Sequence, residues 1–183
     1  MRNRNLSQAV LNFSLVTILF VYPVFLACPV LARLGENIYE FKFQQSESYQ
    51  LKKIVLKDDL KYYFFNLLVH QSELAKAPGF KGGMTVTVEN GLIVSQSLAL
   101  SLGSNNSAGM QLAVKEIFQF SCEALGRVAG GEQEKNEKEF ELFEKAIGLA
   151  LKGQPQELKF PDAAGKLVLK KGKNGNLLIA ALP

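Results

Sequence analysis

Strict alternation of hydrophobic and polar residues predicts a β-hairpin between residues 78 and 102. Met84, Val86 and Val88 alternate with threonine and glutamate, which is the two-residue period of a strand with one buried face. Asn90-Gly91 follows, and both residues tolerate the positive φ angles of a two-residue hairpin turn. We expect the returning arm to place most of its hydrophobic side chains on one face: Leu92, Val94, Leu98, Leu100 and Leu102.

Three further strand patterns precede this hairpin. Aromatic residues alternate with other residues in 38–43, and a run with β-branched residues spans 51–57 before a predicted turn at Asp58-Asp59. The segment 61–70 is hydrophobic on both faces, which is typical of a central strand covered on both sides. A single helical turn is predicted at 72–77.

Two long segments show the period of α-helices. In 108–125 and again in 134–152, hydrophobic residues recur at spacings of three and four, which indicates a helix with one buried face. Gly126 and Gly153 are suited to end these helices. The predicted buried stripes are Ala113, Ile117, Phe120 and Ala124 in the first helix, and Phe140, Phe143, Ile147 and Ala150 or Leu151 in the second.

Short strand patterns complete the chain. They span 158–160, 166–170 and 177–182, with a predicted turn at Asn174-Gly175. The order of strands, two consecutive helices and strands predicts an α+β domain. We expect one antiparallel β-sheet that carries both helices on one face and ends in a C-terminal β-hairpin.

The first 32 residues have the three-part pattern of a secretory signal peptide. Arg2 and Arg4 precede a hydrophobic run, and Val30 and Ala32 supply small residues at positions −3 and −1 before Arg33. We therefore expect residues 1–32 to be removed and residues 33–183 to form a single exported domain, periplasmic or secreted. Two alternatives remain open, namely an uncleaved membrane anchor over 13–32 and lipidation at Cys28.

Charge and cysteine content narrow the range of partners. The chain has 21 basic and 17 acidic residues, and removal of Arg2 and Arg4 with the signal peptide leaves 19 basic ones. This small excess, without an arginine-rich stripe, argues against nucleic acid. Cys122 is then the only thiol, so an intrachain disulfide or a multi-cysteine metal site is excluded. No pattern for zinc, calcium or dinucleotide binding is present, and we expect no cofactor.

Four residues are candidates for ligand or partner contact. His70 is the only histidine, and it shares a predicted strand face with Asn66, while Gln96 interrupts the hydrophobic face of the hairpin. If these strands pair, the three polar side chains can line one small pocket; the alternative is ordinary local hydrogen bonding. Phe80 lies in a glycine-rich loop that leads into a strand and so is no phosphate-binding loop. Its side chain is either an exposed contact residue or part of the core.

These observations favour a non-catalytic function. We expect an exported binding or accessory module of the cell envelope, whose partner is a protein, a peptide or a small apolar ligand. The first alternative is a small hydrolase that uses His70, for which Cys122 is the only possible thiol partner. No Gly-x-Ser-x-Gly motif supports a serine hydrolase. The second alternative is a structural or assembly subunit, including a homo-oligomer.

Overall fold

The computed structural model describes residues 33–38, 48–104, 106–127, 133–163 and 165–183. The predicted signal peptide and the predicted strand over 38–43 lie outside this part of the chain, except for Ile38. Among the described residues, no helix is both long enough and apolar enough to span a membrane.

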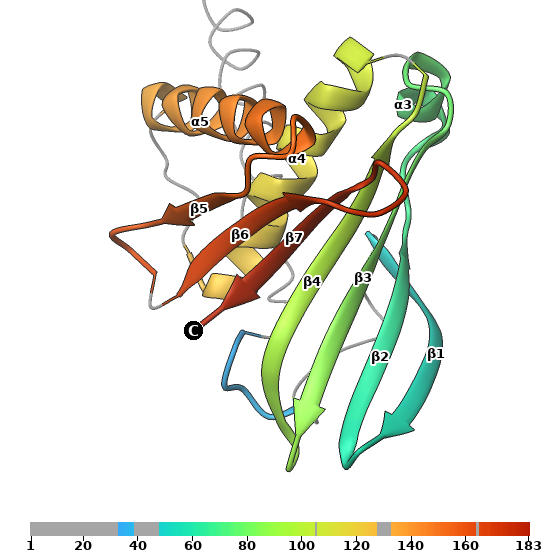
Figure 1. The fold of residues 1–183 in the computed structure, drawn as a ribbon, viewed down its shortest axis with the longest axis vertical. Helices are drawn as coiled ribbons and strands as arrows, with labels where there is room; N and C mark the ends of the chain where they lie inside the picture. The colour runs from blue at the N-terminus through green and yellow to red at the C-terminus, as the bar shows by residue number, and fades with distance from the viewer. Residues whose placement is uncertain (1–32, 39–47, 105, 128–132, 164) are drawn as a thin grey trace, which may run out of the picture.

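The described chain forms a seven-stranded sheet in which every pair of neighbouring strands is antiparallel. The strand order is β1-β2-β3-β4-β7-β6-β5, so the last strand of the chain lies inside the sheet (Figure 1). The predicted α+β class is confirmed. The strands are β1 (Tyr49–Lys57), β2 (Leu60–Leu67), β3 (Phe80–Glu89), β4 (Leu92–Leu102), β5 (Gln156–Lys159), β6 (Lys166–Lys171) and β7 (Leu177–Leu182).

Three helices of the described chain accompany the sheet: α3 (Gln71–Lys76), α4 (Asn106–Leu125) and α5 (Gln133–Leu151). In Figure 1, α4 runs behind β6 and β7, so the reader looks at the opposite face of the sheet, which we call the outer face. α4 contacts β4 and β7, while α5 contacts α4 and the strands β5, β6 and β7. Both long helices therefore pack mainly on the half of the sheet that contains the C-terminal strands.

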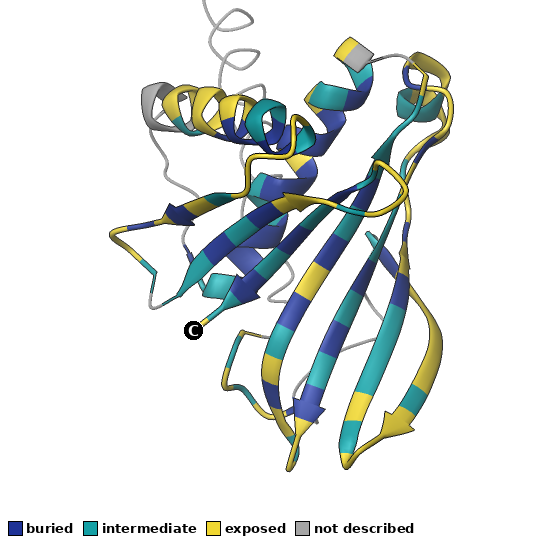
Figure 2. Cartoon of the chain, viewed as in Figure 1, coloured by how far each residue is buried: buried dark blue, intermediate teal, exposed yellow. Residues whose placement is uncertain are grey.

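The hydrophobic core lies between the sheet and the helices. Along β3, β4 and β7, buried residues alternate with less buried ones, whereas β1 is exposed over most of its length (Figure 2). This alternation follows from the two-residue period of a strand. The predicted stripe of α4 is confirmed, because Ala113, Ile117, Phe120 and Ala124 are all fully buried. In α5, Phe143, Ile147 and Ala150 are fully buried, but the predicted burial of Phe140 is wrong. Its side chain is 39% exposed, and its ring contacts Phe118 edge-on.

The predicted turns form as the sequence indicates. Asp58 and Asp59 have φ angles of 51° and 62°, and Asn90 and Gly91 have φ angles of 50° and 83°. Positive φ at both central residues matches the twist of the strands on either side. These two turns set the register of β1 with β2 and of β3 with β4.

The predicted face of β4 is wrong at its first residues. A register shift between Thr87 and Val88 gives β4 one extra residue, a β-bulge. Beyond the bulge the side-chain alternation is reversed, so Ile93 is buried while Leu92 and Val94 are 46% and 37% exposed.

The prediction that β2 is covered on both faces is also wrong. Phe65 and Leu67 are buried on the side of the core, but Asn66 and Leu68 on the other face are exposed. No described element packs over the outer face at this point, which leaves it open for a ligand.

Candidate functional site

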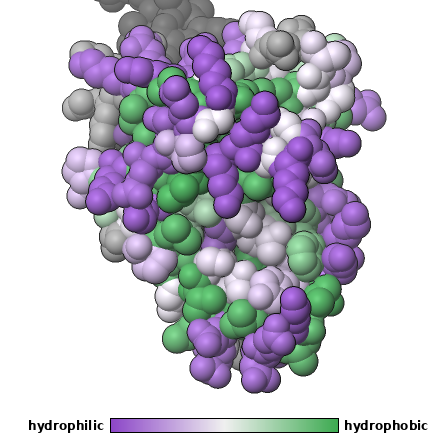
Figure 3. Space-filling model, viewed as in Figure 1, coloured by the Kyte–Doolittle hydropathy of each residue, from purple (hydrophilic) through white to green (hydrophobic). Residues whose placement is uncertain are grey.

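A polar groove lies on the outer face, where β2, β3 and β4 approach the turn between β6 and β7. Its volume is about 720 Å³, which falls within the usual range for ligand pockets. In Figure 3, this face of the molecule is a mosaic of hydrophilic and smaller hydrophobic areas. The lining residues come from five segments: Gln50, Asn66, Leu67, Leu68, Lys81, Gly82, Gly83, Ala99, Leu100, Ser101, Asn174 and Asn176.

Two adjacent glycines of β3 line the groove. Gly83 pairs with Asn66 of β2, and a Cβ atom at Gly83 would lie 2.9 Å from the backbone oxygen of Phe65. A Cβ atom at Gly82 would lie 2.7 Å from a methyl carbon of Leu100. The close packing of these strands therefore requires glycine at both positions. Adjacent residues of a strand point to opposite faces, so Gly82 faces the buried side chains of Leu67 and Leu100, and it is the missing side chain of Gly83 that leaves backbone as the floor.

Amide side chains dominate the walls. Gln50, Asn66, Asn174 and Asn176 each offer a carbonyl oxygen that accepts hydrogen bonds and an NH₂ group that donates them. The two turn asparagines are held by the hairpin between β6 and β7, where Gly172 N donates to Asn176 O at 2.7 Å. The groove can therefore satisfy a ligand that carries donors and acceptors side by side.

Lys81 is the only ionisable residue among those that line the groove. Its side chain is exposed at the start of β3, and no carboxylate belongs to the described residues that line the groove beside it. The local charge is therefore positive, which favours a ligand with a negative group. Ser101 lies opposite Lys81 in the register of β3 with β4 and lines the same groove. Because the Lys81 ammonium is exposed to solvent, we assign it to the recognition of a charged ligand.

The structure does not bring the predicted pocket of Asn66, His70 and Gln96 together. β2 pairs with β3 and not with β4. Asn66 lines the groove on the outer face, whereas Gln96 is buried on the opposite face, in register with Val86 and Ala181. His70 is exposed directly before α3. Of the three, only Asn66 belongs to the groove, and the contact roles of His70 and Gln96 stay predictions.

Phe80 and Cys122 both lie in the interior. Phe80 is 4% exposed and belongs to the hydrophobic core, which is the second of the two positions considered for it. Cys122 is a buried thiol in α4. A thiol within a helix lacks the activation that a helix N-terminus provides, so this residue offers no accessible nucleophile.

Sequence reasoning missed a buried cluster of acidic and phenolic groups, which we call the carboxyl cluster: Tyr49, Glu116, Gln119 and Glu123. Glu116 and Glu123 are 6% and 5% exposed, and Tyr49 is 2% exposed. Gln119 Nε2 donates to Glu123 Oε1 at 2.8 Å and to Ser48 Oγ at 3.2 Å. Within the described part of the chain, one oxygen of each glutamate and the Tyr49 hydroxyl have no hydrogen-bond partner.

Burial changes the ionisation of these groups. Desolvation, opposed by the hydrogen bond from Gln119, raises the pKa of Glu123 from 4.5 to about 8. The pKa of Glu116 is raised to about 7, mainly by desolvation, although Lys115 acts in the opposite direction. Burial and then the charges of both glutamates raise the pKa of Tyr49 well above its ordinary value. Each shift reflects the cost of a charge away from water.

A second buried cluster lies just beyond α4, and we call it the arginine cluster: Ser121, Arg127, Glu139, Phe160 and Asp162. Arg127 Nη2 pairs with Glu139 Oε1 at 2.7 Å and Nε pairs with Asp162 Oδ1 at 3.3 Å. Nη1 donates to Ser121 Oγ at 2.9 Å, and the guanidinium carbon lies 3.8 Å from the centre of the Phe160 ring. This cluster joins α4 to α5 and to the segment after β5, so its role is structural.

The described residues contain no group of three or more His, Cys, Asp or Glu side chains that could hold a metal ion. No protein-family model matches the chain, and neither the curated proteins nor the solved structures contain a significant match. The function must therefore be inferred from the geometry of the groove.

Proposed function

We propose that the chain is a non-catalytic binding module of the cell envelope, exported by means of its N-terminal segment, which holds an extended acidic peptide segment in the outer groove. One observation carries this proposal. The groove combines four amide side chains and one lysine, and its described lining contains no carboxylate.

The shape of the groove supports an extended ligand. Its lining spans β1 to β4, and strands lie about 4.8 Å apart, so it is roughly 14 Å across. This length accommodates about four residues of an extended chain. A peptide backbone alternates N–H and C=O groups, which the side-chain amides can match. An acidic side chain then provides the partner for Lys81.

The groove lacks an aromatic ring among its lining residues. A flat or ring-shaped ligand therefore finds no stacking surface there, which favours a peptide over such ligands. The hydrolase alternative receives less support, because the carboxyl cluster and Cys122 are buried while His70 is exposed. The described lining of the groove also contains no histidine or carboxylate that could act as a general base.

The proposal can be tested with synthetic hexapeptides. One set carries Asp or Glu at alternate positions, and a matched set carries Asn or Gln at the same positions. Binding to the exported protein is measured by fluorescence polarisation. We expect the acidic set to contain binders, and Lys81→Gln to weaken their binding about threefold to tenfold. Lys145→Gln removes the same charge from an exposed position on α5, which does not line the groove, and should leave binding unchanged.

A second variant tests the location independently of charge. Ser101→Tyr places a large side chain into the groove and should abolish binding of the same peptides, while circular dichroism verifies that the fold persists. Equal binding by Ser101→Tyr and wild type would show that the ligand lies elsewhere. Failure of every acidic peptide to bind would reject the peptide proposal.

A further inference from the structure

The first described residues, 33–38, form a segment that we call the N-terminal strap. Leu34 N donates to Ala124 O at 3.2 Å, at the C-terminal end of α4. Gly35 N donates to Ile93 O at 2.8 Å and Ile93 N to Glu36 O at 3.0 Å. Ile38 is 5% exposed and belongs to the core. The strap therefore joins the end of α4 to the beginning of β4.

The last turn of α4 contains no basic residue, although the carbonyl groups at a helix C-terminus favour a cation. Arg127 follows the helix, but its guanidinium is held in the arginine cluster. Arg33 takes this place from outside the helix. A Cβ atom at Gly126, which ends α4 with a φ angle of 66°, would lie 2.8 Å from Arg33 Cδ and Nε.

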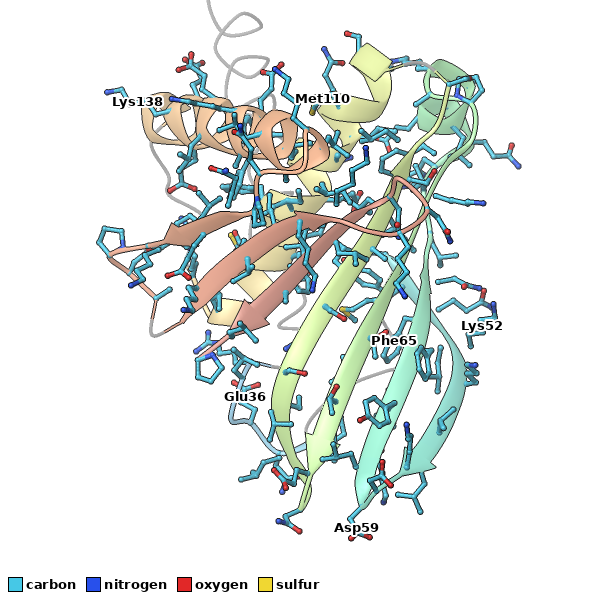
Figure 4. All side chains as sticks on the ribbon, viewed as in Figure 1. Glu36, Lys52, Asp59, Phe65, Met110 and Lys138 are labelled. Carbon is cyan, nitrogen blue, oxygen red and sulfur yellow. The ribbon has the colours of Figure 1, made fainter. Side chains whose placement is uncertain are left out.

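The Glu36 carboxylate interacts with both the backbone and the side chain of Arg33. The backbone nitrogen of Arg33 donates to Glu36 Oε2 at 2.9 Å, and Glu36 N donates back to Arg33 O at 3.1 Å. The Arg33 Nε atom lies 3.8 Å from Glu36 Oε1. Glu36 lies below the end of β7 in Figure 4, and Arg33 and Pro183 line one shared cavity.

We propose that hydrolysis of the peptide bond between Ala32 and Arg33 creates an α-ammonium group that Glu36 binds, so that the new N-terminus becomes part of the fold. The Val30-Leu31-Ala32 sequence meets the small-residue requirement of a leader peptidase. Water supplies the oxygen of the new Ala32 carboxylate, and the Arg33 nitrogen leaves as an amine that takes up a proton. The leader departs with its carboxylate.

An ammonium group suits this position better than the amide that it replaces. The nitrogen keeps its donor position 2.9 Å from Glu36 Oε2 and gains a positive charge, which strengthens the hydrogen bond. The charge also lies next to the C-terminal end of α4, where the helix dipole favours it. Because the contact is exposed to solvent, its contribution is modest and is reduced by salt.

The experiment begins with the intact mass of the exported protein, which should correspond to a chain that starts at Arg33. The N-terminal amine is then acylated with an N-hydroxysuccinimide ester at pH 7, where lysine side chains are mostly protonated. We expect Glu36→Gln to accelerate acylation of this amine about twofold to fivefold. Glu89→Gln, a neutral replacement of an exposed glutamate at the end of β3, should not change the rate.

Two outcomes would overturn the inference. A product that starts at any other residue would place the cleavage elsewhere, and equal acylation rates in wild type and Glu36→Gln would show that Glu36 does not bind the amine. If Glu36→Gln fails to fold, the wild-type protein provides the test. Its acylation should become faster in 1 M salt, and a rate independent of salt would exclude the ion pair.

Discussion

The two buried polar clusters of α4 both place ionisable groups away from water, but they differ in whether these groups have partners. In the arginine cluster, Arg127 has partners on three of its nitrogens, and those partners include two carboxylates and a hydroxyl. In the carboxyl cluster, Glu116, Glu123 and Tyr49 each retain an atom without a hydrogen-bond partner. Both clusters lie on or just after one helix, and both are less than 10% exposed at their central residues.

The difference lies in the signs of the charges. The arginine cluster combines one positive group with negative ones, so its charges can be buried together. In the carboxyl cluster the ionisable groups are all acids, and the nearby Lys115 is exposed and paired with Glu73 at 2.7 Å. These acids can avoid an unpaired buried charge only by keeping their protons. We therefore expect the first cluster to contribute stability at all moderate pH values and the second to make stability depend on pH.

Replacement of the central arginine should have the largest effect. Arg127→Met retains a long apolar side chain but removes the donors for Ser121, Glu139 and Asp162. We expect the free energy of unfolding to fall by about 3 kcal/mol in urea denaturation, the lower end of the range for a broken buried pair because Asp162 is partly exposed to solvent. Lys145→Met, an exposed change on α5, should cost little. Equal losses for both variants would contradict the structural role of the cluster.

Neutralisation of Glu123 should stabilise the protein, but only at high pH. An acid with a raised pKa binds its proton more tightly when folded, so its contribution is present below about pH 4.5 and is lost as the pH rises through about 8. Glu123→Gln removes this loss. We expect a gain of about 1 to 3 kcal/mol at pH 8.5 and little change at pH 5. A gain that is the same at both pH values would exclude titration of Glu123 as its source.

Glu116 should show the same behaviour with a smaller amplitude. Its pKa is raised only to about 7, so the loss of stability in the wild type is complete at a lower pH. At pH 8.5, the gain in the free energy of unfolding should therefore be about 1 kcal/mol smaller for Glu116→Gln than for Glu123→Gln. Urea titrations from pH 5 to 9 give both curves. A larger gain for Glu116→Gln would mean that its pKa is raised further than that of Glu123, which contradicts the order given above.

The smallest effects are expected when one hydroxyl group is removed from each cluster. Ser121 Oγ accepts from Arg127 and donates to Phe118 O at 2.7 Å, so Ser121→Ala should cost about 1 kcal/mol. The Tyr49 hydroxyl is buried and has no partner among the described residues, so Tyr49→Phe should be neutral or stabilising by up to about 1 kcal/mol. Thermal unfolding at pH 6 measures both. Destabilisation by Tyr49→Phe would mean that its hydroxyl is satisfied.

Much of the secondary structure follows from local pattern. The turns at Asp58-Asp59 and Asn90-Gly91 and the buried stripe of α4 form where alternation and helical spacing predict them. The face of β4 at Leu92 was not predictable, because a β-bulge is set by pairing with β3 and leaves no mark in the alternation itself.

The candidate site was predicted only at Asn66. The groove also depends on Asn174 and Asn176, which are more than 100 residues away in the sequence and reach it through the pairing of β7 with β4. Hydrophobic periodicity predicts individual strands, but it does not predict which distant strands pair. Glu116 and Glu123 were missed for a similar reason. Their seven-residue spacing on α4 is typical of a solvated helix face, and only the packing around α4 buries them.

The position of β7 has a consequence for how the protein folds. β7 follows every other element in the chain, yet it lies between β4 and β6 and contributes Leu177, Ile179 and Ala181 to the core, all fully buried. The two halves of the sheet cannot join until this strand is available, so the rate of folding depends on a contact between distant segments. When the chain becomes available from its N-terminal end onward, the sheet would stay incomplete until β7 is present. For a protein exported as proposed, this delay would keep the chain open during transfer.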